Sequence, residues 1–301
     1  RTMLFETTRM TGAFLIAALG TIAGVLVAVS LLDLGSLAPA AAIDPEMREA
    51  GIAGLFTSTY IGGSVNYAAL GEITGLRTDA SFFSAATATD NLFSAVFLSI
   101  LALLPGWNWL ARRFTRHEHG EEQAVAERTD TISATSLTLA LATAISFVAI
   151  GDAITAAVGW PSLRYAIITA LVVTAATAFP GWMERLHGAF EIGVGLAFVF
   201  FTAIAAGANL VAMVSIAPLL IVLVVNLLGV HLLVLLGVGG LFRLTLPELV
   251  TASNAAILGA TTAPALAAAR GWHDLVTPGV LVGVLGYALG TFAGTAVFHW
   301  L

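Results

Sequence analysis

Seven predominantly apolar runs in this chain are each long enough to cross the hydrocarbon layer of a lipid bilayer as an α-helix. A layer of about 30 Å requires about 20 residues of helix. The strands of a membrane β-barrel would be about half as long and would alternate in polarity. We therefore predict transmembrane helices at residues 13–32, 80–104, 133–158, 165–183, 189–211, 216–241 and 278–301.

The charge content supports a membrane protein and excludes several other classes. Only 10% of the residues are charged and the mean hydropathy is +0.96, whereas a soluble domain carries roughly a quarter of its residues as charged ones. A net charge of −6 argues against a nucleic-acid partner, because phosphate binding needs a basic surface. The absence of cysteine excludes disulfides and thiolate metal sites.

Two further segments, residues 51–75 and 246–270, are long enough to span a membrane but have polar centres that contain glycine. Paired glycines, or a glycine followed by a proline, interrupt a helix and free backbone groups. At membrane depth such groups are tolerated only where a cavity or a ligand satisfies them. We predict two discontinuous helices whose centres bind a solute through Thr57, Ser58, Thr59, Tyr60, Gly62, Gly63, Ser64 and Asn66, and through Ser253, Asn254, Gly259, Thr261 and Thr262. The alternative is ordinary helix packing, in which small and hydroxyl residues are also common.

The two polar segments align with each other, which predicts an internal repeat. Placing residues 63–70 over 259–266 brings 57–58 onto 253–254 without a gap. We expect an all-α polytopic protein of about nine spanning segments, in which each half ends in a helix, a broken helix and a helix. Whether the repeat is inverted or parallel stays open, because five predicted helices separate the broken segments.

This repeat divides the chain into three parts. Residues 1–104 are expected to be the C-terminal part of the first repeat, 105–132 a polar loop between the repeats, and 133–301 the second repeat, with its broken helix at 246–270. The second repeat has three predicted helices ahead of its broken unit and the first has none. We therefore expect that about three helices of the first repeat are missing from this sequence.

Asp90 lies near the middle of the predicted helix 80–104, about 15 Å from either end. A carboxylate at this depth costs several kcal/mol unless it is neutralised, and such residues are usually functional. Thr87, Asn91 and Ser94 are close to it at helical spacing. We predict that Asp90, Asn91, Thr87 and Ser94 form an ion-coupling site, where Asp90 exchanges a proton or binds Na⁺ with the Asn91 amide as a second ligand. The alternative is a structural aspartate bonded to a neighbouring helix.

Other polar residues allow weaker interpretations. Asp152 and Glu191 lie near helix ends, where a carboxylate reaches the headgroups. His231 is in mid-helix, and we leave open whether it is a satisfied core residue or part of a proton path. An intramembrane hydrolase would require Ser64 beside His231, or Asp90 facing Asp152, but the surrounding glycine motifs are incomplete. We expect no catalytic residue and no enzyme, with a hydrolase as the alternative of another class.

Four motifs resemble the YjcL-like bacterial membrane proteins of unknown function, the family numbered eight-one-nine in the domain-of-unknown-function series. They are residues 59–66, 90–91, 252–255 and 280–291. The resemblance implies a location in the bacterial inner membrane and a fold similar to the cation:proton antiporter and bile-acid:sodium symporter superfamily, with a panel domain and a core domain. In that superfamily two discontinuous helices cross near the bilayer centre, and the following helix carries the acidic or Asn-Asp ion-binding pair. Asp90 and Asn91 match this position in the reverse order.

Together these observations predict a secondary active transporter that moves a small solute by alternating access, coupled to Na⁺ or H⁺. The N-termini of half-helices favour an anionic solute. The alternative within the same class is a cation/proton antiporter with no organic substrate. Expected partners are the solute, the lipid bilayer and, as an open expectation, a second copy of the chain in a homodimer. No nucleic acid is expected as a partner, and no cofactor other than the coupling ion.

Overall fold

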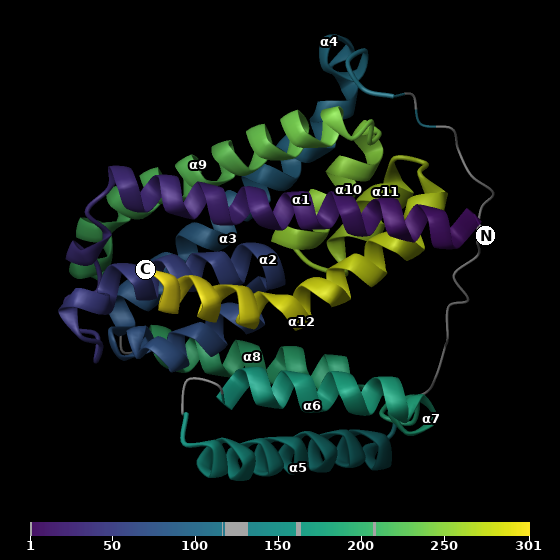
Figure 1. Ribbon diagram of the computed structural model, residues 1–301. Helices are drawn as coiled ribbons and strands as arrows, with labels where there is room; N and C mark the ends of the chain where they lie inside the picture. Colours follow the sequence, from purple (N-terminus) through teal and green to yellow (C-terminus); the bar gives the residue numbers. More distant parts are fainter. Residues whose placement is uncertain (1, 116, 118–131, 161–163, 207–208) are drawn as a thin grey trace.

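The computed structural model describes residues 2–115, 117, 132–160, 164–206 and 209–301, and these form a bundle of helices (Figure 1). In the described ranges the only pairing of β type is an isolated bridge between Thr115 and Thr245. The helices are α1 (Thr2–Leu31), α2 (Arg48–Thr74), α3 (Ala80–Leu103), α4 (Asn108–Ala111), α5 (Ala134–Val158), α6 (Arg164–Ala178), α7 (Pro180–Met183), α8 (Ala189–Ala205), α9 (Leu210–Leu241), α10 (Leu246–Ile257), α11 (Thr262–Ala269) and α12 (Val276–Trp300).

Five of the described helices are both long and apolar enough to cross a membrane, which confirms an all-helical membrane protein. The remaining predicted spans do not meet this standard, for two physical reasons. Polar centres lower the hydropathy of α2 and of the α10–α11 pair, and α6 and α8 have only 15 and 17 residues. The prediction of about nine spanning segments therefore stays a prediction. The five spans are Thr7–Leu31, Ala80–Gly106, Ala134–Val158, Leu210–Leu241 and His273–Trp300.

Several helix ends differ from the predicted ones because of local signals. The helix predicted over 165–183 stops at Ala178, and Pro180, which cannot continue a helix, begins the short α7. The helix predicted over 189–211 ends at Ala205. The next helix already begins at Leu210, because the Asn209 side chain accepts hydrogen bonds from the first free N–H groups of α9.

Both predicted helix breaks are present, each at a glycine. Gly63 inside α2 has φ 73° and ψ −174°, so the helix direction is interrupted there. Gly259, with φ 93°, lies in the gap between the end of α10 and the start of α11. Positive φ values of this kind are strained for any residue with a β-carbon, which explains why glycine occupies both positions. Both halves thus contain a helix, a broken helix and a helix, in α1–α3 and in α9–α12.

The helices form an inner body and an outer layer (Figure 1). Helices α1, α2, α3 and α9 to α12 make the inner body, in which α2 packs along α12 and α1 along α9. The outer layer consists of α5 and α6, with α8 between α5 and α3. Only 11% of the most apolar stretch of α5 is buried in the protein, compared with 44% for that of the span His273–Trp300, which contains α12. The polar segments therefore lie in the well-packed body.

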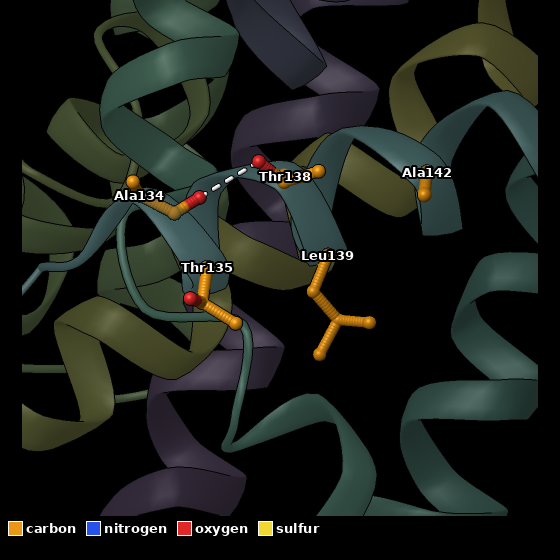
Figure 2. A pocket seen from close by; sticks show the side chains of 5 residues that line it. All are labelled: Ala134, Thr135, Thr138, Leu139 and Ala142. Atoms are coloured by element: carbon orange, nitrogen blue, oxygen red, sulfur yellow. Dashed lines mark hydrogen bonds between the residues drawn. The ribbon is translucent and has the colours of Figure 1, made fainter.

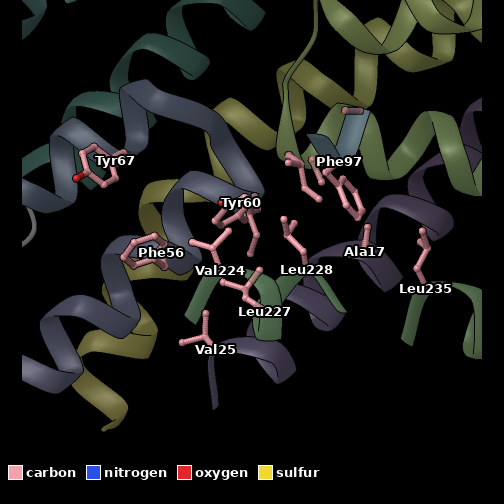
Figure 3. Close-up of a cluster of buried hydrophobic side chains, with 14 of the residues drawn as sticks. Ala17, Val25, Phe56, Tyr60, Tyr67, Phe97, Val224, Leu227, Leu228 and Leu235 are labelled. Atoms are coloured by element: carbon pink, nitrogen blue, oxygen red, sulfur yellow. The ribbon is translucent and has the colours of Figure 1, made fainter. Parts of the chain in front are cut away.

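Aromatic and aliphatic side chains from several helices fill the core of the inner body (Figure 3). Phe56, Tyr60 and Tyr67 of α2 lie on one side, and Phe97 of α3 lies near the aliphatic residues of α9. Figure 3 also labels the buried residues Ala17, Val25, Val224, Leu227, Leu228 and Leu235.

Small residues bring the backbones of α2 and α12 into contact. A β-carbon built on Gly286 would lie 2.5 Å from the carbonyl oxygen of Ile61, and one built on Gly290 would lie 2.7 Å from the Cα of Gly62. Such close approach is possible only without side chains and stabilises helix pairs in membranes. The contacting residues recur every four positions, as Gly54, Ser58 and Gly62 in α2 and as Gly286, Gly290 and Gly294 in α12. This contact holds the broken α2 against a continuous helix.

Candidate ion and solute site

Asp90 is buried between α3 and the polar centre of α2, with 8% of the residue exposed. The Thr59 hydroxyl donates a hydrogen bond to Asp90 Oδ2 at 3.4 Å. The Tyr60 hydroxyl lies beside the same carboxyl, yet it is buried without a partner in hydrogen-bond geometry among the described residues. No basic side chain pairs with Asp90 in the part of the chain that the structure describes. The carboxylate therefore faces hydroxyl oxygens and has no counter-charge among the described residues.

The other predicted ion-coupling residues divide into two groups. Ser94 lies near the Tyr60 hydroxyl, on the Asp90 side of α3. The Thr87 hydroxyl donates to the Phe83 carbonyl at 2.7 Å, one turn before Asp90. Asn91, in contrast, is exposed, and no hydrogen bond joins it to Asp90 in the described ranges. The structure thus brings Asp90, Ser94, Thr59 and Tyr60 together and leaves Asn91 outside this group.

This group of oxygens suits a small monovalent cation or a proton. Na⁺ prefers hard oxygen ligands, as other alkali and alkaline-earth ions do. The described residues contain no cluster of three or more His, Cys, Asp or Glu side chains able to hold a metal ion. A transition metal, which favours imidazole or thiolate ligands, therefore has no matching ligand set in that part of the chain.

The break in α2 is closed by the side chain of Asn66. Its Nδ2 donates to the Gly62 carbonyl at 2.5 Å, and its Oδ1 accepts a hydrogen bond from the Thr291 hydroxyl at 2.5 Å. Ser58 donates to the carbonyl of its own helix, whereas the buried Thr57 hydroxyl has no partner among the described residues. Ser64, directly after the break, is exposed.

The break between α10 and α11 is bridged by the side chain of Asn254. The Asn254 amide donates to the Thr262 carbonyl at 3.2 Å, and its oxygen accepts from the Thr262 hydroxyl at 2.7 Å. Thr261 is exposed and Gly259 is buried. In this conformation the amides of Asn66 and Asn254 bind the protein's own backbone. Their predicted contacts with a solute stay a prediction.

Tyr287 of α12 lies between the two breaks and was not singled out by the sequence patterns alone. Its hydroxyl accepts a hydrogen bond from the Ala260 N–H at 3.1 Å. A β-carbon built on Gly259 would lie 2.6 Å from this hydroxyl, and one built on Gly63 would lie 3.7 Å from the edge of the ring. Tyr287 is 36% exposed, so the region where the breaks meet is open to the surroundings. The only signal in the sequence was a phenol in an otherwise apolar, glycine-rich helix.

His231 of α9 is fully buried and hydrogen-bonded at both ring nitrogens. Its Nε2 lies 2.9 Å from the Ser253 hydroxyl and its Nδ1 lies 3.0 Å from the Thr21 hydroxyl. Thr21 also donates to the Tyr60 carbonyl at 3.3 Å. The histidine is thus satisfied, and it joins the second broken segment to the first. Thr21 was not predicted, because its role depends on the packing of α1 against α9.

The residue pairs that a hydrolase would require are not formed in the described structure. His231 bonds Ser253, while Ser64 is exposed beside the α2 break. Asp152 pairs with Arg164 in the outer layer, at 2.5 and 3.0 Å. Glu191 is exposed in the first turn of α8, as expected for a residue near a headgroup.

Two surface pockets lie in the outer layer, away from the helix breaks. Figure 2 shows one of about 420 Å³ at the start of α5, where Thr138 bonds the Ala134 carbonyl in the wall of the pocket. The other, of about 370 Å³, lies where α5 meets α6, near the Asp152–Arg164 pair. Neither pocket is lined by Asp90 or Tyr287. The pocket shown in Figure 2 is lined by Ala134, Thr135, Thr138, Leu139 and Ala142.

Comparisons with known proteins agree with a membrane protein of an uncharacterised family. The family model described as "Protein of unknown function (DUF819)" matches residues 1–301. The chain is similar to the uncharacterized membrane protein YjcL of Bacillus subtilis (strain 168), with 31% identity over 320 residues, covering 100% of this chain and 78% of YjcL. No solved structure matches the chain. The match to the family model and the similarity to YjcL both show that the chain belongs to the DUF819 family of membrane proteins.

Proposed function

We propose that this protein is a cation-coupled secondary transporter with a fold of the cation:proton antiporter and bile-acid:sodium symporter type. One observation carries the proposal. A buried carboxylate, with no basic partner in the described part of the chain, faces the first of two helices that break at glycines, and both breaks meet at one tyrosine of α12. Breaks of this kind within membrane segments are typical of transporter binding sites.

Asp90 is the ion-coupling residue in this proposal. A bare carboxylate at this depth is several kcal/mol too unfavourable to persist without a proton or a cation. The hydroxyls of Thr59, Tyr60 and Ser94 supply the remaining oxygen ligands. The ion is Na⁺ or H⁺, and its binding and release neutralise and restore the charge during each cycle.

The solute binds where the two breaks meet. Ser64, Thr261 and Tyr287 are exposed there, and the N–H of Ala260, two residues before the start of α11, donates to the Tyr287 hydroxyl. Backbone N–H groups at a helix start favour an anion, so a small anionic solute is proposed. Alternating access moves this region from one side of the membrane to the other.

A cation/proton antiporter without an organic substrate is the second candidate. The observation in its favour is that the amides of Asn66 and Asn254 already bind the protein itself. Fewer polar groups are then available to an organic solute. The two candidates share the role of Asp90, and they differ in whether a solute gradient moves the cation.

The test uses purified protein in proteoliposomes, with Na⁺ and proton gradients imposed separately and uptake of Na⁺ and of a panel of carboxylic acids measured. Asp90→Asn keeps the size and hydrogen bonding of the side chain but removes its charge. We expect this variant to fold normally and to lose cation-dependent transport entirely. Asp152→Asn is the matched control, because Asp152 is also a carboxylate in a long helix but is 46% exposed and paired with Arg164.

The control variant should transport as the wild type does. Cation movement without any solute would identify the antiporter, whereas movement that depends on one carboxylic acid would identify the symporter. Unchanged cation dependence in Asp90→Asn would contradict the proposal and leave Asp90 a structural residue.

A further inference from the structure

The two arms of α2, residues 48–62 before the break and 64–74 after it, lie side by side. A β-carbon built on Gly51 in the first arm would lie 3.6 Å from Cβ of Thr74, the last residue of the second arm. In a continuous helix the same two residues would be about 35 Å apart. The chain therefore turns back at the break and returns toward the end of the bundle where α2 began.

Further contacts along α2 agree with this hairpin. A β-carbon on Gly294 of α12 would meet both arms, at 2.7 Å from the Gly54 carbonyl oxygen and 3.1 Å from Leu70 Cγ. At the open end of the hairpin, the chain before α2 bonds the chain after it, because the Ala42 N–H donates to the Thr78 hydroxyl at 2.7 Å. Both ends of α2 are thus held together.

Helices α10 and α11 form a second hairpin. The Asn254 side chain of α10 bonds Thr262 of α11 across the turn. A β-carbon on Gly279 of α12 would meet both arms, at 3.0 Å from Thr251 Cγ2 and 3.6 Å from the Pro264 nitrogen. Helix α11 therefore runs back alongside α10.

One histidine bonds both ends of this second hairpin. His117 Nδ1 lies 3.4 Å from the hydroxyl of Thr245, the residue directly before α10. Its Nε2 lies 3.2 Å from Oδ1 of Asp274, which follows α11 and precedes α12. The ends of the second hairpin thus also lie together, as the ends of α2 do.

Helix α12 shows that the two hairpins begin at opposite ends of the bundle. Its 25 residues span about 37 Å, more than the hydrocarbon layer of a bilayer. Gly279, near its start, lies against the α10–α11 hairpin, and Gly294, near its end, lies against α2. Figure 1 shows α10 and α11 beside the first part of α12 and α2 beside its last part. Tyr287, which contacts both breaks, is at the middle of the helix.

The surroundings of the two hairpins suit segments that enter a membrane without facing lipid. Backbone that turns back at membrane depth is tolerated only where protein or a water-filled cavity surrounds it. Residues 50–62 of α2 and 248–257 of α10 are all buried in the protein. Their polar residues therefore avoid the lipid.

We propose that α2 and the α10–α11 pair are re-entrant hairpins that enter the membrane from opposite faces, with their tips beside Tyr287 at mid-membrane. The family resemblance implies discontinuous helices that cross, each of which would leave at the other face, whereas each hairpin returns to its own face. The inference rests on the proposed function for the role of the tips, and it places the proposed solute region one hairpin away from each face.

The same inference gives the internal repeat its direction. Five predicted helices separate the two broken segments, and an odd number of crossings carries the chain to the opposite face of the membrane. Two hairpins with this separation therefore enter from opposite faces. The repeat is then inverted, which is the arrangement that supports alternating access in many transporters.

Labelling of single cysteines from each face of the membrane tests this topology. The protein contains no cysteine, so each introduced thiol is the only one that reacts. A membrane-impermeant maleimide is applied to bacterial spheroplasts and to inside-out vesicles that contain the full chain. We expect the two variants that flank α2 to react several-fold faster in one preparation, and the two that flank α10–α11 in the other. The variants, all at exposed positions, are Glu46→Cys and Thr78→Cys, and Phe242→Cys and Arg270→Cys.

Leu301→Cys is the matched control, because the continuous helix α12 separates Leu301 from Arg270. It should react in the preparation opposite to that of Arg270→Cys. A split of either flanking pair between the two preparations, such as Glu46→Cys in one and Thr78→Cys in the other, would show a crossing helix and overturn the inference. Reaction of both pairs from the same face would also overturn it. Labelling does not depend on transport, so either result leaves the role of Asp90 to its own test.

Discussion

Asn66 is the residue on which the α2 break depends most directly. Its amide group binds the Gly62 carbonyl that the break releases and the Thr291 hydroxyl of α12. In Asn66→Ala both partners become buried and unpaired, so we expect the free energy of unfolding to fall by about 1–3 kcal/mol. Thermal unfolding in detergent measures this change. Asn91→Ala removes an exposed asparagine from α3 and should stay within about 0.5 kcal/mol of the wild type. Equal effects of the two substitutions would show that the Asn66 contacts are not stabilising.

At the scale of helices, the contact between α2 and α12 depends on the absence of side chains. A β-carbon on Gly290 would lie 2.7 Å from Gly62 Cα and 2.9 Å from the Ser58 carbonyl oxygen, so Gly290→Ala must force the two helices apart. Overpacking of this kind costs about 1–3 kcal/mol and moves the α2 break away from Tyr287. We expect a lower melting temperature and loss of the proposed transport activity. Gly237→Ala in α9, where a β-carbon would meet nothing within 4 Å, is the control and should keep both properties. Full activity of Gly290→Ala would contradict a role for close packing.

The sequence predicts the elements of this fold better than it predicts their partners. The breaks at Gly63 and Gly259 and the depth of Asp90 are local properties, because glycine content and distance from helix ends are visible in one segment. The positions of Tyr287 and Thr21 depend on which helices pack together, and no local pattern specifies that packing. The four-residue glycine spacing of α12 is a visible signal, but it indicates a close contact without naming α2 as the partner.

At the scale of the whole molecule, the outer layer and the inner body differ in how much protein surrounds each helix. Only 11% of the α5 window is buried, compared with 39% for the windows in α1 and α9. Regions with few buried contacts open more readily by local unfolding. In detergent we therefore expect backbone amides of α5 and α6 to exchange with deuterium faster than those of α1, α9 and α12. Mass spectrometry after pulse labelling measures this difference. Uniform protection across all these helices would mean that the outer layer is as stable as the inner body.

The asparagines that close the two breaks have a consequence for the transport cycle proposed above. Asn66 donates to the Gly62 carbonyl at the α2 break, and Asn254 ties the end of α10 to Thr262, the first residue of α11. The unloaded protein therefore has no energetic need for cargo in order to keep its broken helices intact. If the protein is the transporter proposed above, it can then reorient empty, and an empty return step separates net accumulation of a solute from obligatory one-for-one exchange. Under that proposal the two amide side chains favour net transport of the solute over one-for-one exchange.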